Sequence, residues 1–468
     1  LDEHLFGRDV ELARLMKAKM NVATFVGASI NSASSDGSDF VCEAAFVGGY
    51  AGSGKSSLLL PFMEACVEEQ WFGLGCKFDQ QTAPVKVLFK AFNDFFGKWG
   101  EPGSSNSDYS PLLVASFRKV CGRIIATVDD DGFDQLADLV PNFTRLFPLV
   151  TKRFSGRDEG GGISSMDKVG SAQNRLQKLV HVLLESICSA GRPVLFTVDD
   201  LQWSDSFVLE GLTDFVVNCL HDSGSGASCR RGLFIAGTYR SNEVKEDGPL
   251  LESIDRLKLA EKANVTMLTT GELSKADVTR LISAKLCLPW RYTRDLAEVV
   301  QSKTRGNPFF VIQFLRSIVS NKMLEFSVRS RRWIWDCDVV EMQMISDGVA
   351  GLLAASFNQL PSQLTKTMKI VSCLGYQVDR PTIDALDSIR EVLSFCMLDQ
   401  MELAVKEGIL ERAGPVYQFT HDIVQQTIYE LIPPGDRKVL HKLIGQSLLK
   451  AARRRPTMHL LAVDQINM

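Results

Sequence analysis

The sequence lacks a long hydrophobic run, since no apolar stretch approaches the ~18 residues that a membrane-spanning helix needs. No signal-peptide core follows its largely polar first residues, 1–4. Its 11 cysteines include no C-x-x-C pair, which argues against a zinc site and a disulfide framework and fits a reducing compartment. We therefore expect a cytoplasmic protein without a membrane segment.

An excess of one charge is also missing. The net charge of −4 gives no whole-chain attraction to nucleic acid or to an anionic membrane. With 468 residues, 45% of them hydrophobic, the chain can form about three ordinary domains with sizeable cores. It starts without Met and ends without a closing motif, so we expect it to be a piece of a longer protein.

The arrangement of apolar runs predicts alternating strands and helices in the first half. Helical spacing dominates residues 84–150 and 173–190, with loops at 29–39 and 155–165. Strands are predicted at Val41–Val47, Gly73–Asp79, Val194–Val198 and Leu233–Thr238. Such alternation indicates a parallel sheet that is buried on both faces. Beyond it we predict helices over 272–325, a β-hairpin over 324–336 and helices from 348 to the end.

The most informative motif is G-x-x-x-x-G-K-S, which lies between the first strand and a predicted helix. The glycines let the backbone curl so that N–H groups and the helix N-terminus can point at phosphates. Lys55 would reach the terminal phosphates, and the Ser56 hydroxyl would bind Mg²⁺. The predicted phosphate-binding residues are Gly49, Tyr50, Ala51, Gly52, Ser53, Gly54, Lys55, Ser56 and Ser57.

Two carboxylates follow the strand Val194–Val198. In ATPases with such a loop, the strand beside the loop delivers an acid to Mg²⁺. Asp199 fits that role, and Asp200 could orient or deprotonate the attacking water. Arg240 closes the next strand and could contact the γ-phosphate, although a solvated arginine is the alternative.

These motifs occur in the order found in the STAND class of signalling ATPases. The sequence resembles most the origin-recognition-like AAA ATPase modules that are fused to cyclases, protein kinases and transcription activators. The resemblance spans nearly the whole chain and is carried by LFGRD at 5–9, the phosphate loop, VDDLQWSD at 198–205, TYR at 238–240, GNPFF at 306–310 and FTHD at 419–422.

The resemblance implies an α/β P-loop ATPase core with strand order 5-1-4-3-2, followed by a helical lid, a winged helix and the start of a helical repeat array. We place the domain boundaries at 1–245 for the core, 246–325 for the lid, 326–435 for the winged helix and 436–468 for the C-terminal helical region. The nucleotide is expected to be ATP or ADP, because no N-K-x-D guanine motif follows the sheet.

Three further residues take their roles from the resemblance alone. Arg8 would lie near the adenine, and Pro308 would line the base pocket, although a proline at a helix boundary is the alternative. His421 resembles a histidine that contacts the ADP β-phosphate; the alternative is a helix-start residue capped by Thr420. The Asp199–Asp200 pair replaces the Asp-Glu of many related ATPases, and no arginine finger can be assigned, so slow hydrolysis is expected.

The resemblance therefore predicts a nucleotide switch with ADP-closed and ATP-open states, which would act on an effector domain in cis or on self-assembly. A winged-helix DNA-binding ATPase is one alternative, but Arg329, Arg331 and Arg332 and the run 453–455 fit solvated faces better, and nucleic acid is not expected. A nucleotide-binding scaffold without turnover is another. A small-molecule kinase fits least, because no second phosphate motif is present.

Overall fold

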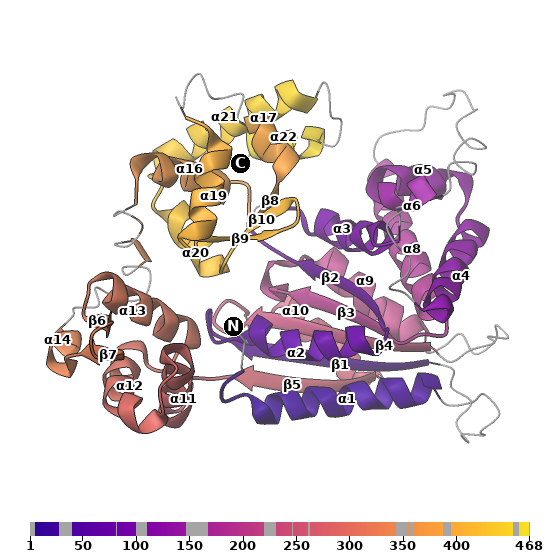
Figure 1. The fold of residues 1–468 in the computed structure, drawn as a ribbon. Coiled ribbons are helices and arrows are strands. Elements are labelled where there is room, and N and C mark those ends of the chain that lie inside the picture. Colours follow the sequence, from indigo (N-terminus) through magenta and orange to yellow (C-terminus); the bar gives the residue numbers. More distant parts are fainter. Residues whose placement is uncertain are drawn as a thin grey trace.

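The computed structural model describes residues 5–467 except 28–39, 81, 100–109, 147–166, 220–230, 246, 261–262, 343–352, 355–356, 358–359, 387–394 and 453–457. The predicted loops at 29–39 and 155–165 and the basic run at 453–455 lie outside the described residues. Three parts follow one another along the chain: a core with a five-stranded sheet, a lid beside it, and a C-terminal unit over one edge of the sheet (Figure 1).

The core is built on a parallel sheet in the order β2-β3-β4-β1-β5. The strands are β1 (Phe40–Gly49), β2 (Phe72–Lys77), β3 (Val194–Asp199), β4 (Arg231–Arg240) and β5 (Ala263–Thr270). This confirms the predicted order. It also corrects one expectation, because β4 lies between β1 and β3, so the acidic pair is not on the strand beside the phosphate loop.

Strand β5 changes the predicted extent of the core. It pairs with β1 from Cys42↔Ala263 to Gly49↔Thr270, so the sheet continues past the boundary placed at residue 245. This strand has a weak signature in the sequence, because most of its residues are partly or fully exposed and several carry polar side chains. An edge strand of this kind lacks the continuous apolar run that marks strands β1, β3 and β4.

Helices cover both faces of the sheet. The helices α1 (Asp9–Gly27) and α2 (Lys55–Glu68) bury one face through Leu15, Val22, Leu58 and Phe62. The other face carries a larger cluster from α3 (Pro84–Gly97), α9 (Ser206–Cys219) and α10 (Pro249–Leu259), extended by α4 (Pro111–Thr127), α5 (Asp130–Leu139), α6 (Pro141–Leu146) and α8 (Asp167–Cys188). Burial on both faces fixes the sheet, and therefore the edge at which its strands end.

The lid has its own apolar core. It comprises α11 (Lys275–Leu286), α12 (Trp290–Thr304) and α13 (Pro308–Ser320), followed by the predicted hairpin, β6 (Leu324–Ser327) and β7 (Arg332–Trp335), and by α14 (Cys337–Met342). The hairpin packs on the lid, because Leu324, Trp333 and Trp335 belong to the same apolar cluster as the lid helices. The predicted start of a new domain at residue 326 therefore falls inside this packed group.

The C-terminal unit contains a small antiparallel sheet, β8-β10-β9, and not only helices as predicted for the residues after 348. Strands of three and four residues are too short to show a period-two pattern. We call the elements from α16 to α22 the C-terminal unit: α16 (Ser362–Ser372), β8 (Gln377–Asp379), α17 (Arg380–Leu386), α19 (Met397–Lys406), β9 (Leu410–Ala413), β10 (Val416–Phe419), α20 (Asp422–Glu430), α21 (Pro434–Ala452) and α22 (Met458–Asn467). One apolar cluster unites them.

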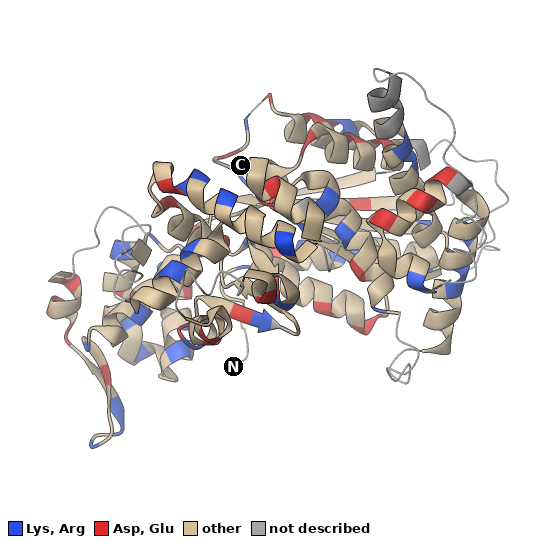
Figure 2. Ribbon diagram, turned by 90° about the horizontal axis from the view of Figure 1, so that it is seen from above, with Lys and Arg blue, Asp and Glu red and all other residues tan. Residues whose placement is uncertain are grey.

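Two observations bear on the surface of the molecule. Among the described residues, no helix combines the length and the apolar character that crossing a membrane requires. Basic and acidic residues are interspersed over the described helices and strands, and blue and red segments follow one another in Figure 2. This pattern agrees with the small net charge of −4.

Candidate functional site

The carboxyl ends of the parallel strands bring the predicted site residues to one edge of the sheet. β1 ends at Gly49, β3 at Asp199 and β4 at Arg240, and Gly49 is the register partner of Arg240. In open α/β sheets, ligands bind just outside the carboxyl ends of the strands. The phosphate-loop motif and the acidic pair therefore lie at the edge where a ligand site is expected.

Residues 49–56 form a tight turn from β1 into α2, and glycine is needed at three positions. Gly52 and Gly54 have φ angles of 75° and 87°, in the left-handed region that favours glycine. A Cβ atom on Gly49 would lie 2.2 Å from Thr270 Oγ1. The turn leads directly into the N-terminus of α2, where the first backbone N–H groups lack helical partners and can bind an anion.

Lys55 is held inside the turn. Its side chain donates hydrogen bonds to the carbonyl oxygens of Gly49, at 3.2 Å, and Tyr50, at 2.9 Å. Burial lowers the pKa of Lys55, and the carboxylates of Asp200, Asp422 and Asp199 oppose this shift. A buried ammonium that is hydrogen-bonded to carbonyl oxygens can gain a charge-assisted hydrogen bond from an arriving phosphate.

Ser56 and Asp199 join the loop to the acidic pair across the intervening strand. The Ser56 hydroxyl lies 3.1 and 3.0 Å from the two carboxylate oxygens of Asp199, and Thr238 on β4 donates a hydrogen bond to the same carboxylate. Burial alone would raise the pKa of Asp199, but Lys77, Thr238 and Ser56 lower it below its ordinary value. An ionised carboxylate beside a hydroxyl is the oxygen donor set that suits Mg²⁺.

These two oxygen donors fit a metal ion that takes only part of its ligands from the protein. Among the described residues, no group of three or more His, Cys, Asp or Glu side chains could hold a metal ion. Mg²⁺ is commonly bound through one or two protein oxygens together with water and substrate phosphates. Ser56 and Asp199 therefore fit a cation that arrives with a phosphate ligand.

Asp200 lies next to this pair in a different environment. Its backbone is left-handed, with φ 58°, and its carboxylate accepts a hydrogen bond from Gln202 Nε2 at 2.9 Å. Burial, and then the charge of Asp199, raise the pKa of Asp200. The two adjacent acids thus have pKa values shifted in opposite directions, which is the pattern expected of one metal ligand and one general base.

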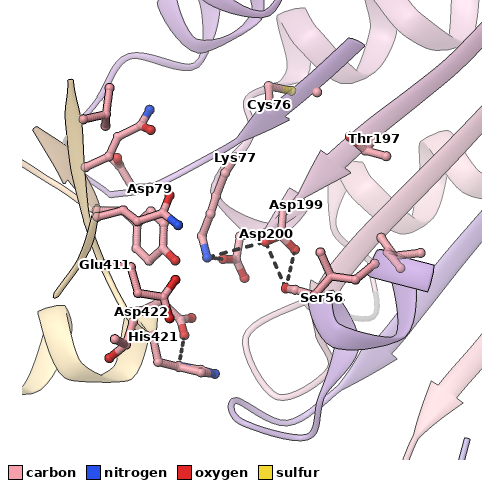
Figure 3. A pocket seen from close by; sticks show the side chains of 18 of the residues that line it. Ser56, Cys76, Lys77, Asp79, Thr197, Asp199, Asp200, Glu411, His421 and Asp422 are labelled. Carbon is pink, nitrogen blue, oxygen red and sulfur yellow. Dashed lines mark hydrogen bonds and ion pairs between the residues drawn. The ribbon is translucent and has the colours of Figure 1, made fainter. Parts of the chain in front are cut away.

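A cleft of about 1810 Å³ opens over these residues. Lys55, Ser56, Asp199 and Asp200 line it from the core, and Leu5 and Phe6 line it near the lid. His421 and Asp422 of the C-terminal unit line its opposite wall, and in Figure 3 their side chains face the acidic pair across the cleft.

A family model described as an AAA ATPase domain matches residues 4–217. The match contains the phosphate loop, the acidic pair and the strands that carry them. Residues 4–217 form an AAA ATPase domain. The family predicted from the sequence motifs is therefore confirmed for this part of the chain. The matched segment ends before β4 and β5, which complete the sheet of the domain.

One curated relative is "Hybrid signal transduction histidine kinase G" of Dictyostelium discoideum, which is 25% identical over 259 residues. The alignment covers 47% of this chain and 7% of that protein, so the chain spans only a small part of the relative.

Several solved structures resemble the model. One is a STAND protein with a tetratricopeptide repeat sensor from Pyrococcus horikoshii, with TM-score 0.42, 15% identity, and 95% of this chain and 46% of that chain covered. Others are Cdc6p from Pyrobaculum aerophilum, with TM-score 0.37, 10% identity and 95% of each chain covered, and an Aeropyrum pernix ORC2 protein, with TM-score 0.37, 9% identity, and 92% and 96% covered. Since these TM-scores are below 0.5, the family assignment depends on the match of residues 4–217.

Arg240 connects the AAA ATPase domain to the C-terminal unit. Its guanidinium is 3.7 Å from the Asp200 carboxylate, 2.6 Å from Glu243, and bonded to Asp422 at the start of α20. Burial alone would lower the pKa of Arg240, but Asp422, Asp200 and Glu243 raise it. In this structure Arg240, the predicted γ-phosphate contact, forms ion pairs with three acidic residues. Its role toward phosphate stays a prediction.

His421 lies at the N-terminus of α20. Its Nδ1 accepts the Ile423 N–H at 3.2 Å, so His421 itself caps the helix. The alternative of capping by Thr420 is wrong, because the Thr420 hydroxyl donates to the carbonyl oxygens of Gly408 and Ile409. The His421 ring packs on Phe309 of the lid at 4.4 Å between centroids. The predicted contact with a nucleotide phosphate remains a prediction.

Arg8 and Pro308 contact the phosphate loop from other directions. The buried Arg8 guanidinium donates to the carbonyl oxygens of Ser53, at 3.1 Å, and Gly271. Pro308 begins α13, and its Cγ would lie 3.9 Å from a Cβ atom on Gly54. The structure thus places both residues at the loop, where Arg8 braces the backbone. Their predicted proximity to adenine stays untested.

Two residues were missed by the sequence analysis. Thr238 bridges the acids, since it donates to Asp199 and its oxygen accepts the Asp200 N–H at 3.1 Å. Lys77 places its ammonium 3.4 Å from both carboxylates, and the pKa of Lys77 is raised by Asp199, Tyr376 and Asp200 although burial alone would lower it. Each lies at or near the carboxyl end of a predicted strand, so the strand-end rule applied to every strand would have found both.

Proposed function

We propose that this chain is an ATP-binding, slowly hydrolysing nucleotide switch module of a signalling or regulatory protein, closed with ADP and open with ATP. The observation that carries the proposal is the contact between Ser56 and Asp199, which joins the phosphate loop to the acidic pair at 3.0 Å. That pair lies in a cleft whose opposite wall belongs to another part of the chain. The membership of residues 4–217 in the AAA ATPase family supports nucleotide as the ligand.

Different residues of the site would bind the phosphates, bind Mg²⁺ and promote hydrolysis. Lys55 and the N-terminus of α2 would hold the phosphates, and Ser56 with Asp199 would hold Mg²⁺. When bound, Mg²⁺ neutralises negative charge on the phosphate oxygens. Asp200 would accept the proton of the attacking water, since its raised pKa moves it toward the range of a general base.

Slow turnover follows from the surroundings of Asp200. Its carboxylate is shared among Gln202, Lys77 and Arg240, at 2.9, 3.4 and 3.7 Å. Burial and Asp199 raise the pKa of this carboxylate, whereas Lys77 and the hydrogen bond from Gln202 favour its ionised form and oppose its uptake of a proton. An arginine finger from a neighbouring subunit would raise the rate, and self-assembly is the means by which one could be supplied.

The C-terminal unit is the element that the nucleotide would move. Its helix-strand-helix-helix order followed by the hairpin β9–β10 supports a winged helix, with α21 and α22 as the start of a helical array. It contacts the core through buried or half-buried ion pairs, Arg240–Asp422 and Lys86–Asp464. Contacts of this kind can break without unfolding either part, so the unit can dock or separate as the ligand changes.

An effector domain in cis is the proposed partner of the switch. The similarity of 259 residues to a small part of a histidine kinase of Dictyostelium discoideum supports a place for this module in a longer signalling protein. A DNA-binding function has no comparable support, since basic and acidic residues are interspersed along the described helices and strands (Figure 2).

Calorimetry with ADP and with a non-hydrolysable ATP analogue, each with Mg²⁺, tests the proposal together with small-angle scattering. We expect both ligands to bind and the radius of gyration to be larger with the analogue. Phosphate release at saturating ATP should be slow but measurable. Absence of heat with either nucleotide would refute the proposal, and binding with no phosphate release would reduce the module to a scaffold.

A further inference from the structure

Lys77 is a cation of the site that belongs to no motif. It ends β2 and is the register partner of Asp199 on β3, so the two side chains leave the sheet side by side. Its ammonium lies 3.4 Å from Asp199 Oδ2 and 3.4 Å from Asp200 Oδ2 (Figure 3). The proposed metal ligand and the proposed base therefore share one lysine.

Lys77 differs from Arg240 in the direction that it faces. Arg240 is enclosed, with a side-chain exposure of 5%, and its guanidinium is engaged with Asp422 and Glu243. Lys77 has an exposure of 24% and lines the cleft together with Lys55 and Ser56, whereas Arg240 does not line it. Of the two cations beside the acids, Lys77 is the one that an arriving phosphate would meet.

The same ammonium also contacts the C-terminal unit. It lies 3.9 Å from the centre of the Tyr376 ring, a cation–π contact. Tyr376 directly precedes β8, and its carbonyl accepts the Phe419 N–H of β10 at 3.0 Å. Because the backbone of Tyr376 is bonded to the small sheet, a displacement of the ammonium changes a contact between the core and the C-terminal unit.

We propose that Lys77 distinguishes a nucleoside triphosphate from a diphosphate and transmits the difference to Tyr376; this rests on the proposed function. With a diphosphate, the ammonium stays between the acids and the Tyr376 ring, as in the structure. A terminal phosphate adds negative charge on the cleft side and attracts the ammonium away from the ring. The loss of the cation–π contact then weakens docking of the C-terminal unit.

Two substitutions of Lys77 test the binding half of the proposal. Lys77→Met keeps the length of the side chain and removes its charge, whereas Lys77→Arg keeps the charge. In calorimetry with Mg²⁺, we expect Lys77→Met to bind the non-hydrolysable ATP analogue about tenfold or more weakly and ADP within about threefold of the parent. Lys77→Arg should retain most of the preference. Equal losses for both nucleotides would indicate a structural role only and would overturn the proposal.

Substitution of Tyr376 tests the transmission half. Tyr376→Leu keeps an apolar side chain but removes the ring, so docking should weaken while Lys77 stays able to contact a terminal phosphate. Its radius of gyration by small-angle scattering should already be enlarged with ADP and should change less on replacement by the analogue. Lys86→Met is the matched control, because it removes another ion pair between core and C-terminal unit, Lys86–Asp464 at 2.6 Å, away from the acids. That variant should retain the difference between nucleotides.

The outcomes separate this inference from the function on which it rests. If the parent protein binds neither nucleotide, or has the same dimensions with both, the switch itself is refuted. If the parent discriminates and opens while Lys77→Met does the same, only the role of Lys77 is refuted. Unchanged ADP binding by Lys77→Met shows that the variant is folded, so loss of analogue binding cannot then be attributed to misfolding.

Discussion

The two walls of the cleft are built in different ways. On the core side, the phosphate loop is held by backbone geometry, with left-handed Gly52 and Gly54 and a lysine bonded to carbonyl oxygens of its own turn. On the side of the C-terminal unit, the contacts are made by side chains from distant parts of the sequence, such as Arg240 with Asp422. The first wall is a preformed anion site, and the second is an interface that can open.

This difference separates binding from response. Left-handed glycines and the hydrogen bonds of Lys55 hold the loop within its own turn, so we expect its conformation to be the same whether the C-terminal unit is docked or not. The ion pairs across the cleft depend on charge, and a phosphate or a metal ion brings charge to the same place. Asp200 lies in the core wall but is linked to the other one, because it contacts Lys77 and Arg240, which in turn contact Tyr376 and Asp422 of the C-terminal unit.

The largest expected effect comes from removing the charge of Asp200, which links the two walls through Lys77 and Arg240. Asp200→Asn should bind nucleotide with unchanged affinity but release phosphate about 10²-fold or more slowly, as expected for the loss of a general base. Asparagine tolerates the left-handed backbone found at this position, so the fold should be retained. Phosphate release under saturating ATP measures it. The control is Asp214→Asn, which changes an exposed ion pair with Arg256; a parent-like rate in Asp200→Asn would remove this residue from the mechanism.

The next largest effect is expected from a substitution that weakens the interface between the core and the C-terminal unit. Arg240→Ala leaves Asp422 and Glu243 without their buried partner, and breaking such a pair costs about 3–5 kcal/mol. We expect the C-terminal unit to become sensitive to protease, while ADP affinity changes little. Limited proteolysis and calorimetry measure the two effects. Arg280→Ala, which removes an exposed pair with Asp277, should behave like the parent. If Arg240→Ala stays as resistant as the parent, docking does not depend on this pair.

The contrast between the walls also explains how far the sequence could predict the structure. The phosphate loop and the acids are local motifs whose conformations follow from glycine spacing and strand ends, so their place in the sheet was predicted correctly. The strand order 5-1-4-3-2 came from the family resemblance and is confirmed, whereas the reasoning from the acids alone placed them on the strand beside the loop, because the residues of a strand do not say which strand lies next to it. The edge strand β5 and the short strands β8 to β10 have too little periodicity to be recognised.

Contacts across the cleft could not be predicted at all. Lys77 and Tyr376 are separated by about three hundred residues, and their contact depends on how the C-terminal unit lies over the sheet. A lysine at the end of a strand and a tyrosine before another strand form no recognisable sequence motif. Only the arrangement of the folded parts shows that Lys77 contacts Tyr376 and shares Asp200 with Arg240.

A substitution in the core wall should change nucleotide affinity without changing the docking of the C-terminal unit. Lys55→Ala should weaken nucleotide binding about tenfold or more, because each charge-assisted contact with phosphate is worth about 1.5–3 kcal/mol. The docked state should persist, since the hydrogen bonds of Lys55 are made within its own loop. Calorimetry gives the affinity and proteolysis the docking. Lys275→Ala, on an exposed lid ion pair, is the control. Loss of docking in Lys55→Ala would contradict the separation of the two walls.

The smallest effect is expected where the interface is most exposed. Lys86 of α3 pairs with Asp464 of α22 at 2.6 Å, with side-chain exposures of 32% and 29%. Half-exposed pairs of this kind are worth about 0–1 kcal/mol, and salt screens them. Lys86→Met should therefore loosen docking only slightly, and less at high salt than at low salt. Protease sensitivity measured at two salt concentrations checks this. An effect as large as that of Arg240→Ala would mean that docking is governed by contacts far from the acids, and the cleft would no longer explain how a nucleotide could control it.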